Sequence, residues 1–399
     1  MIEMRKKCDV LVVGAGPGGS TVARYAALAG ADVLLIEKRQ EVGSPVRCGE
    51  GISAEWLEKY DIIPDPSWAR NKVDGARVFS PNGTMFTVNA ENAGDEVGYV
   101  IERDAFDRML AERAVRAGAE LKLKTAALGI IKKDGKVVGA KVECMGERFD
   151  IEAPIVVGAD GYESQVGRWA GIDTNVDTKD VQSCLQYRMV GLELTGNFVD
   201  FYLGSKVVPG GYIWSFPKGK DEANIGIGLQ VSMVKEPGDA KKYLDKFIAA
   251  HPNMAKGQAV EMVAGAVSVC LPPDRTVADG VMLVGDAARQ IDPLTGGGIA
   301  NSVKAGKVAG EVAAQAIEAK DYSAEFFQRY EKGWRAIFEN KLYRDYMAKE
   351  KLLTLSDETL DKLVSALAEG QLTKVSTLSV LQAIRRKYPE LVKEFEDML

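Results

Sequence analysis

The sequence predicts an α/β fold in which a parallel sheet covered by helices is interrupted by a mostly antiparallel sheet and followed by a helical C-terminal region. Short apolar runs that end in glycine or an acidic residue are typical of buried parallel strands. In this chain they are Val10–Val13, Val33–Ile36, Ile155–Val157 and Val281–Val284. Alternating and β-rich runs, typical of antiparallel strands, dominate from Val181 to Cys270. Residues 323–399 have a helical pattern and mixed charge.

The first apolar run leads directly into Gly14-x-Gly16-x-x-Gly19, and an Ala-rich helical segment follows from Ser20 to about Ala29. A dinucleotide-binding fingerprint requires this order of strand, glycine loop and helix. Gly14 permits the tight turn, Gly16 lets a pyrophosphate approach the backbone, and Gly19 lets the helix pack closely on the strand. The N–H groups and partial positive charge at the helix N-terminus favour phosphates.

The second apolar run, Val33–Ile36, ends in Glu37. Its distance from the glycine loop is close to the spacing of about 20 residues that the fingerprint has. An acidic side chain there accepts hydrogen bonds from both hydroxyls of an adenosine ribose and disfavours a 2′-phosphate. Together these features predict a Rossmann-like dinucleotide-binding domain at the N-terminal end of the sequence.

The composition narrows the class of protein. The chain has 399 residues and a formal net charge of −6, which argues against a nucleic-acid partner. The five cysteines are scattered without a C-x-x-C pair, so we expect a reducing compartment and no metal site. The single histidine, His251, leaves no basis for Ser–His–Asp catalysis, and its position beside Pro252 suggests a structural role.

No targeting or membrane-spanning segment is predicted. The apolar run after Arg5 is brief, contains Asp9 and merges with the glycine loop, unlike a signal peptide. No stretch approaches the roughly 18 consecutive apolar residues of a transmembrane helix. We therefore expect a cytoplasmic protein whose membrane contact would be peripheral, at the inner face of the membrane.

Two later motifs join the glycine loop and Glu37 in one pattern. One is Gly158-Ala159-Asp160-Gly161-x-x-Ser164. The other is Gly285-Asp286-Ala287-Ala288, followed by Pro293 and by Gly296-Gly297-Gly298. Together they resemble the para-hydroxybenzoate-hydroxylase-like FAD-dependent oxidoreductases over roughly residues 1–320. The chain departs from the family where Gly167 takes the place of a basic residue, with Arg168 one position later.

This resemblance implies FAD as the cofactor. It places Asp286 beside the ribityl or ribose part of FAD, and the N-terminus of the helix that follows Gly298 beside the flavin N1–C2 carbonyl. A helix N-terminus stabilises the negative charge that reduced flavin carries there. The cofactor-binding residues that the motifs and the resemblance imply are Gly14, Ala15, Gly16, Gly19, Glu37, Cys48, Gly49, Gly51, Arg103, Ala127, Asp160, Asp286, Gly297, Gly298 and Ile299.

A narrower resemblance concerns the substrate. The segment Pro209-x-x-Tyr212-x-Trp214-x-Phe216-Pro217 and the loop Cys48-Gly49-Glu50-Gly51 look like signatures of geranylgeranyl reductases, most of all the archaeal digeranylgeranylglycerophospholipid reductases. These enzymes saturate the geranylgeranyl chains of isoprenoid ether phospholipids in membrane lipid biosynthesis. The resemblance makes Tyr212, Trp214 and Phe216 substrate-binding residues, although their period of two also fits the inner face of an ordinary strand.

The implied reaction needs hydride from N5 of reduced flavin and a proton from elsewhere, because an isolated alkene has no carbonyl to stabilise a carbanion. Cys48, Tyr212 and a water held near Glu50 are the candidates for the proton, and we expect Cys48 and Tyr212 to be catalytic. The flavin would be reduced by a nicotinamide cofactor or a ferredoxin, between which the sequence does not choose.

Other proteins of the same fold remain alternatives. A flavin monooxygenase shares all three FAD motifs. A flavin halogenase has a similar aromatic signature with two Trp, whereas this chain has Tyr212 at the first position. A quinone-reducing electron-transfer flavoprotein needs a four-cysteine cluster, which scattered cysteines do not supply. A prenyl-lipid binding protein would lack the complete FAD pattern that this chain retains.

The remaining predicted elements set the domain boundaries. We expect hairpins turning at Pro81-Asn82-Gly83 and at Asp134-Gly135, and a long helix from Ile299 to about Ala319. The predicted domains are a discontinuous FAD-binding domain (1–73, 102–175 and 271–322), an antiparallel-sheet substrate and catalytic domain (74–101 and 176–270) and a helical C-terminal region (323–399).

Overall fold

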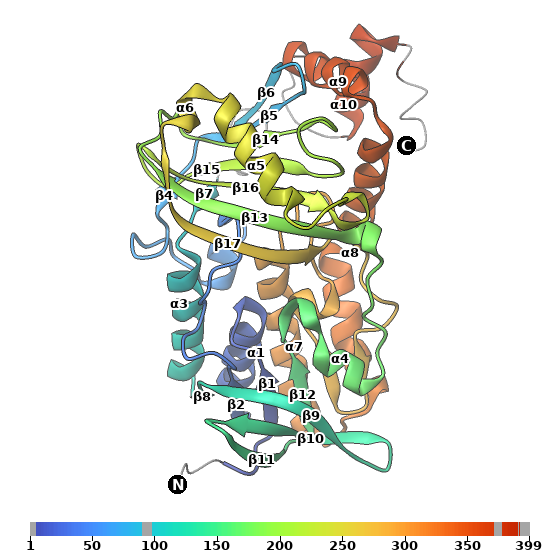
Figure 1. Ribbon diagram of the computed structural model, residues 1–399. Helices are drawn as coiled ribbons and strands as arrows, with labels where there is room; N and C mark the ends of the chain where they lie inside the picture. Colours follow the sequence, from blue (N-terminus) through green and yellow to red (C-terminus); the bar gives the residue numbers. More distant parts are fainter. Residues whose placement is uncertain (1–4, 90–97, 371–376, 390, 392–399) are drawn as a thin grey trace. The chain divides into compact units, whose positions relative to one another are not determined.

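The computed structural model describes residues 5–89, 98–370, 377–389 and 391 (Figure 1). The chain forms two compact units. Unit 1 comprises residues 1–45, 104–176 and 268–346, and unit 2 comprises residues 46–103, 177–267 and 347–399.

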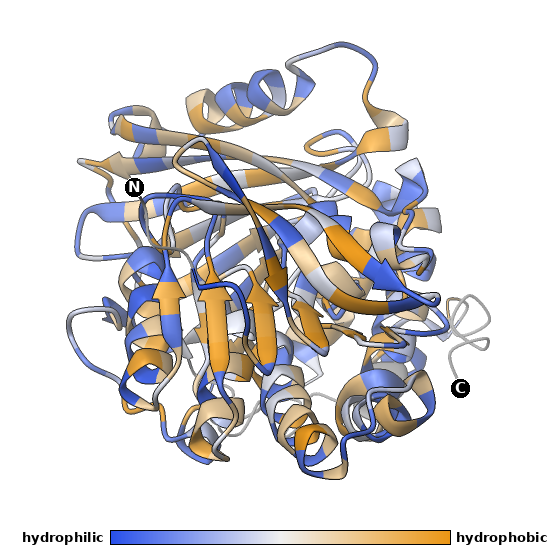
Figure 2. Cartoon of the chain, turned by 90° about the horizontal axis from the view of Figure 1, so that it is seen from below, coloured by the Kyte–Doolittle hydropathy of each residue, from blue (hydrophilic) through white to orange (hydrophobic). Residues whose placement is uncertain are grey.

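Unit 1 is built on a six-stranded sheet in the order β18-β19-β12-β1-β2-β8. Its strands are β1 (Val10–Val13), β2 (Val33–Ile36), β8 (Glu120–Lys122), β12 (Ile155–Gly158), β18 (Val277–Ala278) and β19 (Val281–Leu283). β1 pairs in parallel with β2 and with β12, and β18 joins antiparallel at the edge. The residues of β1, β2 and β12 are buried throughout, as in a sheet covered on both faces. Short strands coloured as strongly hydrophobic lie side by side in Figure 2. The predicted parallel sheet is confirmed.

Helices α1 (Pro17–Leu28) and α7 (Ile299–Ala319) pack closely in unit 1. A Cβ at Gly306 would lie 2.7 Å from the carbonyl oxygen of Gly18, and one at Gly310 would lie 2.7 Å from that of Val22, so glycine permits this approach. α7 has the predicted bounds. α1 begins three residues before the predicted Ser20, because Pro17 has a backbone conformation suited to the first helical position and needs no N–H there.

The other elements of unit 1 surround this core. Its helices include most of α3 (Arg103–Arg116), α4 (Gln165–Ala170) and α8 (Ala324–Thr354) as far as Tyr346. A three-stranded antiparallel sheet contains β9 (Thr125–Lys133), β10 (Lys136–Cys144) and β11 (Glu147–Glu152). The turn between β9 and β10 at Asp134 and Gly135 was predicted, and both residues have positive φ (50° and 80°), as a two-residue hairpin turn requires. β11 was not predicted.

Unit 2 is built on a seven-stranded sheet in the order β17-β13-β16-β15-β14-β5-β6. Its strands are β5 (Gly75–Phe79), β6 (Met85–Asn89), β13 (Val181–Val190), β14 (Phe198–Tyr202), β15 (Tyr212–Pro217), β16 (Glu222–Gln230) and β17 (Gln258–Ser268). Most described pairings are antiparallel, as predicted, and β14 pairs in parallel with β5. On one face, Ile213, Ile225 and Ile227 form a core with Leu244 of α5 (Asp239–Ala250).

Smaller elements complete unit 2. They are β3 (Gly51–Ser53), β4 (Asn71–Lys72), β7 (Gly98–Val100), α6 (Pro252–Ala255), α9 (Asp357–Glu369) and α10 (Thr377–Lys387). His251 lies between α5 and α6, where its Nδ1 is 2.7 Å from the Phe247 oxygen and its ring packs on Phe247, in keeping with a structural role. Asp357 and Asp361 of α9 accept N–H groups from Ser205 and Asn82, so α9 docks on the turn of the β5–β6 hairpin.

The two units do not follow the predicted domain boundaries. Residues 46–73 belong to unit 2, and the C-terminal region is divided after Tyr346. Compact units are not the same as functional domains, so the predicted division by function stays a prediction. Of the helices in the described ranges, none combines the length and the hydropathy needed to cross a membrane.

Candidate functional site

The glycine loop after β1 has two glycines that the fold requires and one that it does not. Gly14 has a φ of +103°, and a Cβ there would lie 2.3 Å from the carbonyl oxygen of Ala159. A Cβ at Gly19 would lie 1.9 Å from the oxygen of Gly14. A Cβ at Gly16 would have no atom of the described chain within 4 Å. The predicted roles of Gly14 in the tight turn and of Gly19 in close packing of the helix on the strand are confirmed, and Gly16 borders open space.

Two long helices in unit 1 begin at glycine. Gly16 is the N-cap of the 12-residue α1, and Gly298 is the N-cap of the 21-residue α7, which starts at Ile299. No side chain of the described residues caps either end. The first N–H groups of a helix lack intrahelical partners and carry partial positive charge. Both N-termini therefore suit an anionic ligand.

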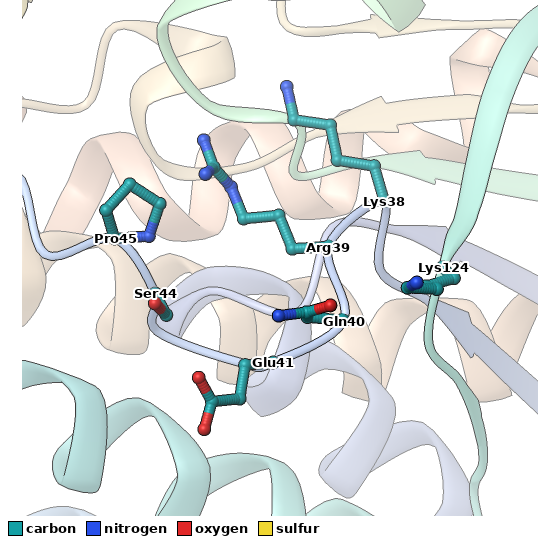
Figure 3. A pocket seen from close by; sticks show the side chains of 7 residues that line it. All are labelled: Lys38, Arg39, Gln40, Glu41, Ser44, Pro45 and Lys124. Carbon is teal, nitrogen blue, oxygen red and sulfur yellow. The ribbon is translucent and has the colours of Figure 1, made fainter.

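The Glu37 carboxylate accepts hydrogen bonds from two backbone N–H groups, one in the glycine loop and one just after Glu37 itself. Its Oε2 accepts the N–H of Ala15 at 3.1 Å, and its Oε1 accepts the N–H of Arg39 at 2.9 Å. Beside it lies a hollow of about 290 Å³, shown in Figure 3, whose lining residues are Lys38, Arg39, Gln40, Glu41, Ser44, Pro45 and Lys124. The side chains of Lys38 and Arg39 extend to the same side of the loop, whereas Glu41 points away. This cationic rim suits a phosphate-bearing ligand near the glycine loop.

Asp160 of the second motif has an incomplete set of hydrogen bonds. Its Oδ2 accepts the N–H of Val166 at 2.9 Å, but its buried Oδ1 has no partner among the described residues. Burial raises the pKa of Asp160, and the N–H of Val166 partly offsets this. Since buried polar atoms nearly always have partners, Oδ1 is a candidate ligand contact. Ser164 donates to the oxygen of Ala287 at 2.7 Å and so ties the second motif to the third.

The third motif is held by residues that the sequence analysis missed. Asp286 lies in a short turn, where its Oδ1 would be 3.2 Å from a Cβ at Gly298. Asp292 accepts the N–H groups of Leu294 and Thr295 at 3.0 and 3.1 Å, which fixes the turn leading to Gly297 and Gly298. Burial opposes the charge of Asp292, but the Lys341 ammonium, 2.5 Å away, outweighs it and lowers the pKa of that carboxyl. The Asp292-Pro293 pair in the sequence is a turn signal that could have revealed this loop.

In unit 2, three aromatic residues lie on one face of β15. We call Tyr212, Trp214 and Phe216 the aromatic strand. Trp214 and Phe216 are 7% and 9% exposed, and Tyr212 is half-buried. Phe201 of β14 packs edge-on against Tyr212 and Phe216, with ring centroids 5.4 Å apart in each case. The predicted alternation is confirmed, and these rings form an apolar cluster with Val73 and Val100.

The loop Cys48-Gly49-Glu50-Gly51 packs directly on the aromatic strand. A Cβ at Gly49 or at Gly51 would lie 3.0 Å from Cε2 of Phe216. Gln186 of β13 links the two motifs, because its Nε2 donates to the Cys48 oxygen at 3.0 Å and its Oε1 accepts Trp214 Nε1–H at 2.9 Å. The two segments that carried the substrate resemblance are thus in contact, although no local pattern had singled out Gln186.

Glu50 is occupied by protein donors. Its Oε2 accepts Lys218 Nζ at 2.5 Å and Asn224 Nδ2 at 2.6 Å, and its Oε1 accepts the N–H of Arg103 at 2.7 Å. The Lys218 side chain is 0% exposed and also contacts Glu102 at 2.9 Å. The Glu50 carboxylate, which the sequence analysis names as a possible holder of water, is therefore part of a buried ion pair.

The Cys48 thiol is kept protonated by its surroundings. Burial raises its pKa, the Arg103 guanidinium lowers it, and the Glu50 carboxylate raises it again. The N–H of Glu50 lies 3.2 Å from Cys48 Sγ. Burial also raises the pKa of Cys184, in the same apolar cluster, to about 12. Cys48 thus has the form of a proton donor rather than of a thiolate nucleophile.

The predicted site residues fall into two groups. Unit 1 contains Gly14, Ala15, Gly16, Gly19, Glu37, Ala127, Asp160, Asp286, Gly297, Gly298 and Ile299. Unit 2 contains Cys48, Gly49, Gly51, Arg103, Tyr212, Trp214 and Phe216. Their roles toward a cofactor or substrate stay predictions. Ala127 lies half-buried on β9, and Arg103 lies beside Cys48 and Glu50.

Two family models match the chain. The model for the geranylgeranyl reductase catalytic domain matches residues 180–267, which include the aromatic strand. The model for pyridine nucleotide-disulphide oxidoreductases matches residues 8–211. The first model therefore covers most of the seven-stranded sheet, and the second begins at the glycine-loop strand.

The chain is also similar over its whole length to known sequences and structures. The digeranylgeranylglycerophospholipid reductase of Thermoplasma volcanium is 50% identical over 98% of this chain and 99% of its own length. That of Thermoplasma acidophilum is 51% identical over the same shares. The crystal structure of a geranylgeranyl bacteriochlorophyll reductase-like protein from Thermoplasma acidophilum is 50% identical, with a TM-score of 0.94, and covers 99% of this chain and 100% of its own. A flavin-dependent brominase, 20% identical with a TM-score of 0.71 over 99% of this chain and 100% of its own, shares the fold alone.

Proposed function

Because the chain belongs to the digeranylgeranylglycerophospholipid reductase family, we propose that it is an FAD-dependent reductase of geranylgeranyl chains on isoprenoid ether phospholipids. It saturates isolated C=C bonds by adding a hydride and a proton. The observation that carries this proposal is the packing of the Cys48–Gly51 loop on the aromatic strand. The aromatic strand lies within residues 180–267, which the geranylgeranyl reductase catalytic domain model matches. An apolar face next to a half-buried thiol that stays protonated suits an uncharged alkene.

The residues of unit 1 fit FAD. Gly16 borders open space at the N-terminus of α1, which suits a pyrophosphate. Glu37, whose Oε2 accepts the N–H of Ala15 in the glycine loop, would supply the carboxylate that an adenosine ribose needs. The unpartnered Oδ1 of Asp160 and the N-terminus of α7 offer further polar contacts. When bound, FAD supplies the hydride chemistry. Asp286, Gly297 and Gly298 would hold its ribityl chain and ring.

The residues of unit 2 would bind and protonate the substrate. Tyr212, Trp214 and Phe216 belong to an apolar cluster that would form a wall against an isoprenoid chain, remove the chain from water and exclude water from the reacting carbon. Burying a chain of about 20 carbons releases roughly 16 kcal/mol gross at about 0.8 kcal/mol per carbon. Ordering the chain offsets much of this. Cys48 holds its proton because burial raises its pKa, and Tyr212 is the second candidate for the proton.

Three further parts of the proposal follow from the reaction. An external reductant, either a nicotinamide cofactor or a ferredoxin, must renew the reduced flavin. The lipid substrate resides in a bilayer, so the enzyme makes peripheral contact with the membrane. Since the isoprenoid chain of the lipid dominates its recognition, we expect lipids with several different polar head groups to be accepted.

Anaerobic turnover tests the function. Holoenzyme reduced with dithionite is mixed with digeranylgeranylglyceryl phosphate under nitrogen, and the lipid is analysed by mass spectrometry. The expected product gains two hydrogen atoms per double bond and no oxygen. Strict dependence on oxygen, with one oxygen atom added, would make the protein a monooxygenase. Binding without a change in mass would make it a prenyl-lipid carrier.

A further inference from the structure

In unit 2, charged side chains of alternating sign form a connected network that includes Glu50 of the Cys48–Gly51 loop. Lys218 bridges Glu50 and Glu102 at 2.5 and 2.9 Å, and Glu102 accepts two hydrogen bonds from Arg188 at 3.0 Å each. Arg188 continues to Glu222 at 2.6 Å. Arg70 also belongs to this network: it lies 3.5 Å from Glu222, and its side chain is half-exposed. The network contains three carboxylates and three cations, so its charges balance.

The loop is fastened to the sheet by three polar side chains from three different strands or their ends. Gln186 donates to the Cys48 oxygen at 3.0 Å, and Asn224 donates to the Gly49 oxygen at 3.2 Å and to Glu50 Oε2 at 2.6 Å. Lys218 supplies the charged contact to Glu50. These contacts place the loop backbone against the sheet at successive residues, so its position is fixed by polar groups as well as by the packing on Phe216.

Glu50 has a backbone conformation that an L-residue rarely adopts. Its φ is +72°, in the left-handed region. Such a conformation persists only where the surroundings hold it, and here Lys218, Asn224 and the N–H of Arg103 hold the carboxylate. The same backbone turn brings the Glu50 N–H to 3.2 Å from Cys48 Sγ. The ion pair is therefore connected to the thiol through the backbone of a single residue.

We propose that Lys218 is a positioning residue of the reduction, which through Glu50 fixes the loop turn that orients the Cys48 thiol at the aromatic strand. This inference rests on the proposed function. Lys218 follows Pro217 at the end of β15, so the strand that presents the aromatic face also carries the group that fixes the loop. One strand thereby aligns the substrate-binding surface and the proton donor with each other.

Removal of the ammonium has a defined consequence. In Lys218→Met, the buried Glu50 carboxylate loses its counter-charge and must either take up a proton or leave the sheet. Either change removes a charge that raises the pKa of Cys48 and loosens the loop turn. The thiol then becomes easier to ionise and is no longer held in place.

The chain offers a matched control. Lys349 pairs with Asp180 in the same unit, and both side chains are 8% exposed. Lys349→Met also removes a buried ammonium from a carboxylate, and the ion pairs of Lys349 are with Asp180 and Glu350 rather than with Glu50. The double variant Glu50→Gln with Lys218→Met removes both charges of the pair. It replaces Lys218→Met in the experiment if the single variant does not fold.

The experiment uses FAD-loaded full-length protein and two readouts. The first is kcat and KM for anaerobic reduction of digeranylgeranylglyceryl phosphate. The second is alkylation by iodoacetamide at pH 8, followed by mass spectrometry of the peptide that contains Cys48. For Lys218→Met we expect kcat to fall roughly 100-fold with little change in KM, as for a misplaced reacting group. Alkylation of Cys48 should rise several-fold, because loss of the neighbouring negative charge lowers the pKa of the thiol and the thiolate is the form that reacts.

The outcomes separate the possible roles. Lys349→Met with wild-type kcat and wild-type alkylation supports the proposal. A folded, FAD-loaded Lys218→Met protein with both readouts unchanged overturns it, and so does an equal loss in the two lysine variants, which would mean general destabilisation. If the wild-type protein does not reduce the lipid at all, the proposed function fails, while the alkylation of Cys48 still reports whether Lys218 fixes the loop.

Discussion

Gly49 lies directly against the ring of Phe216: a Cβ at position 49 would be 3.0 Å from Phe216 Cε2 and 3.4 Å from Trp214 Nε1. Position 49 favours glycine because the side chains of Phe216 and Trp214 lie close to its backbone, not because the backbone has an unusual φ. The loop with Cys48 and the strand with Trp214 therefore pack as one element. A substitution in the loop should therefore displace the aromatic side chains of the strand, and a substitution in the strand should displace the loop.

This packing predicts coupling between positions 49 and 216. Gly49→Ala pushes on the Phe216 ring and should lower anaerobic turnover several-fold without loss of FAD. Phe216→Leu makes room, so Gly49→Ala should cost much less when combined with Phe216→Leu, with a coupling energy of about 1 kcal/mol in a double-mutant cycle. The cycle is measured on kcat at saturating lipid. Strict additivity would mean that the loop and ring do not act on each other.

The glycine loop after β1 predicts a contrast between two substitutions. A side chain at Gly16 meets only open space, so Gly16→Val should fold normally but block approach to the pyrophosphate and give nearly colourless protein. Gly14→Ala should fail to fold, since its Cβ would collide with the Ala159 oxygen at 2.3 Å and its φ is +103°. Circular dichroism reports folding, and flavin absorbance relative to protein absorbance reports loading. A bright yellow Gly16→Val protein would contradict the fingerprint interpretation.

Most of the fold followed from local patterns. The strands at Val10 and Val33 and the helix that starts at Ile299 have the predicted bounds, because buried apolar runs and long helical periodicity are strong signals. The start of α1 was misplaced, because glycine and proline disfavour helix interiors yet are accepted in its first turn. β11 was missed because its six residues, Glu147–Glu152, are mostly charged, and only two apolar side chains mark the alternation of a strand.

The candidate site was only partly predictable. Glycine loops and aromatic alternation are local, so their residues could be named. The contacts that fix them are not local: Lys218 and Glu50 are 168 residues apart, and Gln186 and Cys48 are 138 apart. A lysine or glutamine in a strand has no pattern that reveals its partner. Only folding of the sheet brings these side chains under the loop.

Cys8 predicts a specific loss of stability at alkaline pH. Burial raises its pKa from 9.0 to about 12, partly offset by Arg5, and the residue is 2% exposed. Between these pH values the unfolded thiol has lost its proton and the folded thiol has not, so the unfolded state is favoured as pH rises. The stabilising contribution is complete below pH 9 and falls by about 1.4 kcal/mol per pH unit above it.

The measurement compares wild type with Cys8→Ala by urea unfolding at pH 7.5 and pH 10.5. Titration of other groups is common to both proteins and cancels in the difference. We expect the wild type to lose about 2 kcal/mol more than the variant over this range. Equal losses would mean that the folded thiol titrates like an exposed one.

Trp214 predicts a dependence on chain length. Its ring lies on Gly226, where a Cβ would be 2.2 Å from Trp214 Cζ2, and its Nε1–H is bonded to Gln186. Trp214→Ala removes apolar surface, so kcat/KM should fall about tenfold more for a geranylgeranyl lipid than for a geranyl lipid, roughly the contribution of two methylene groups. Trp214→Phe keeps most of the surface but loses the bond to Gln186, so it should lower kcat for both lipids alike. A loss independent of chain length in Trp214→Ala would exclude this strand from chain recognition.

The proton donor can be identified by comparing Cys48 with Tyr212. Burial keeps the Cys48 thiol protonated well above neutral pH, so if it is the donor, the rate should stay flat to about pH 9, its ordinary pKa, and fall only above it. Cys48→Ala should retain FAD and lose roughly 100-fold or more in saturation, the usual contribution of a general acid. Tyr212→Phe should change the rate little, since the ring that contacts Phe201 and Trp214 is kept. The reverse pattern, with Cys48→Ala active and giving the same products and Tyr212→Phe inactive, would assign the proton to the phenol and leave Cys48 a packing residue.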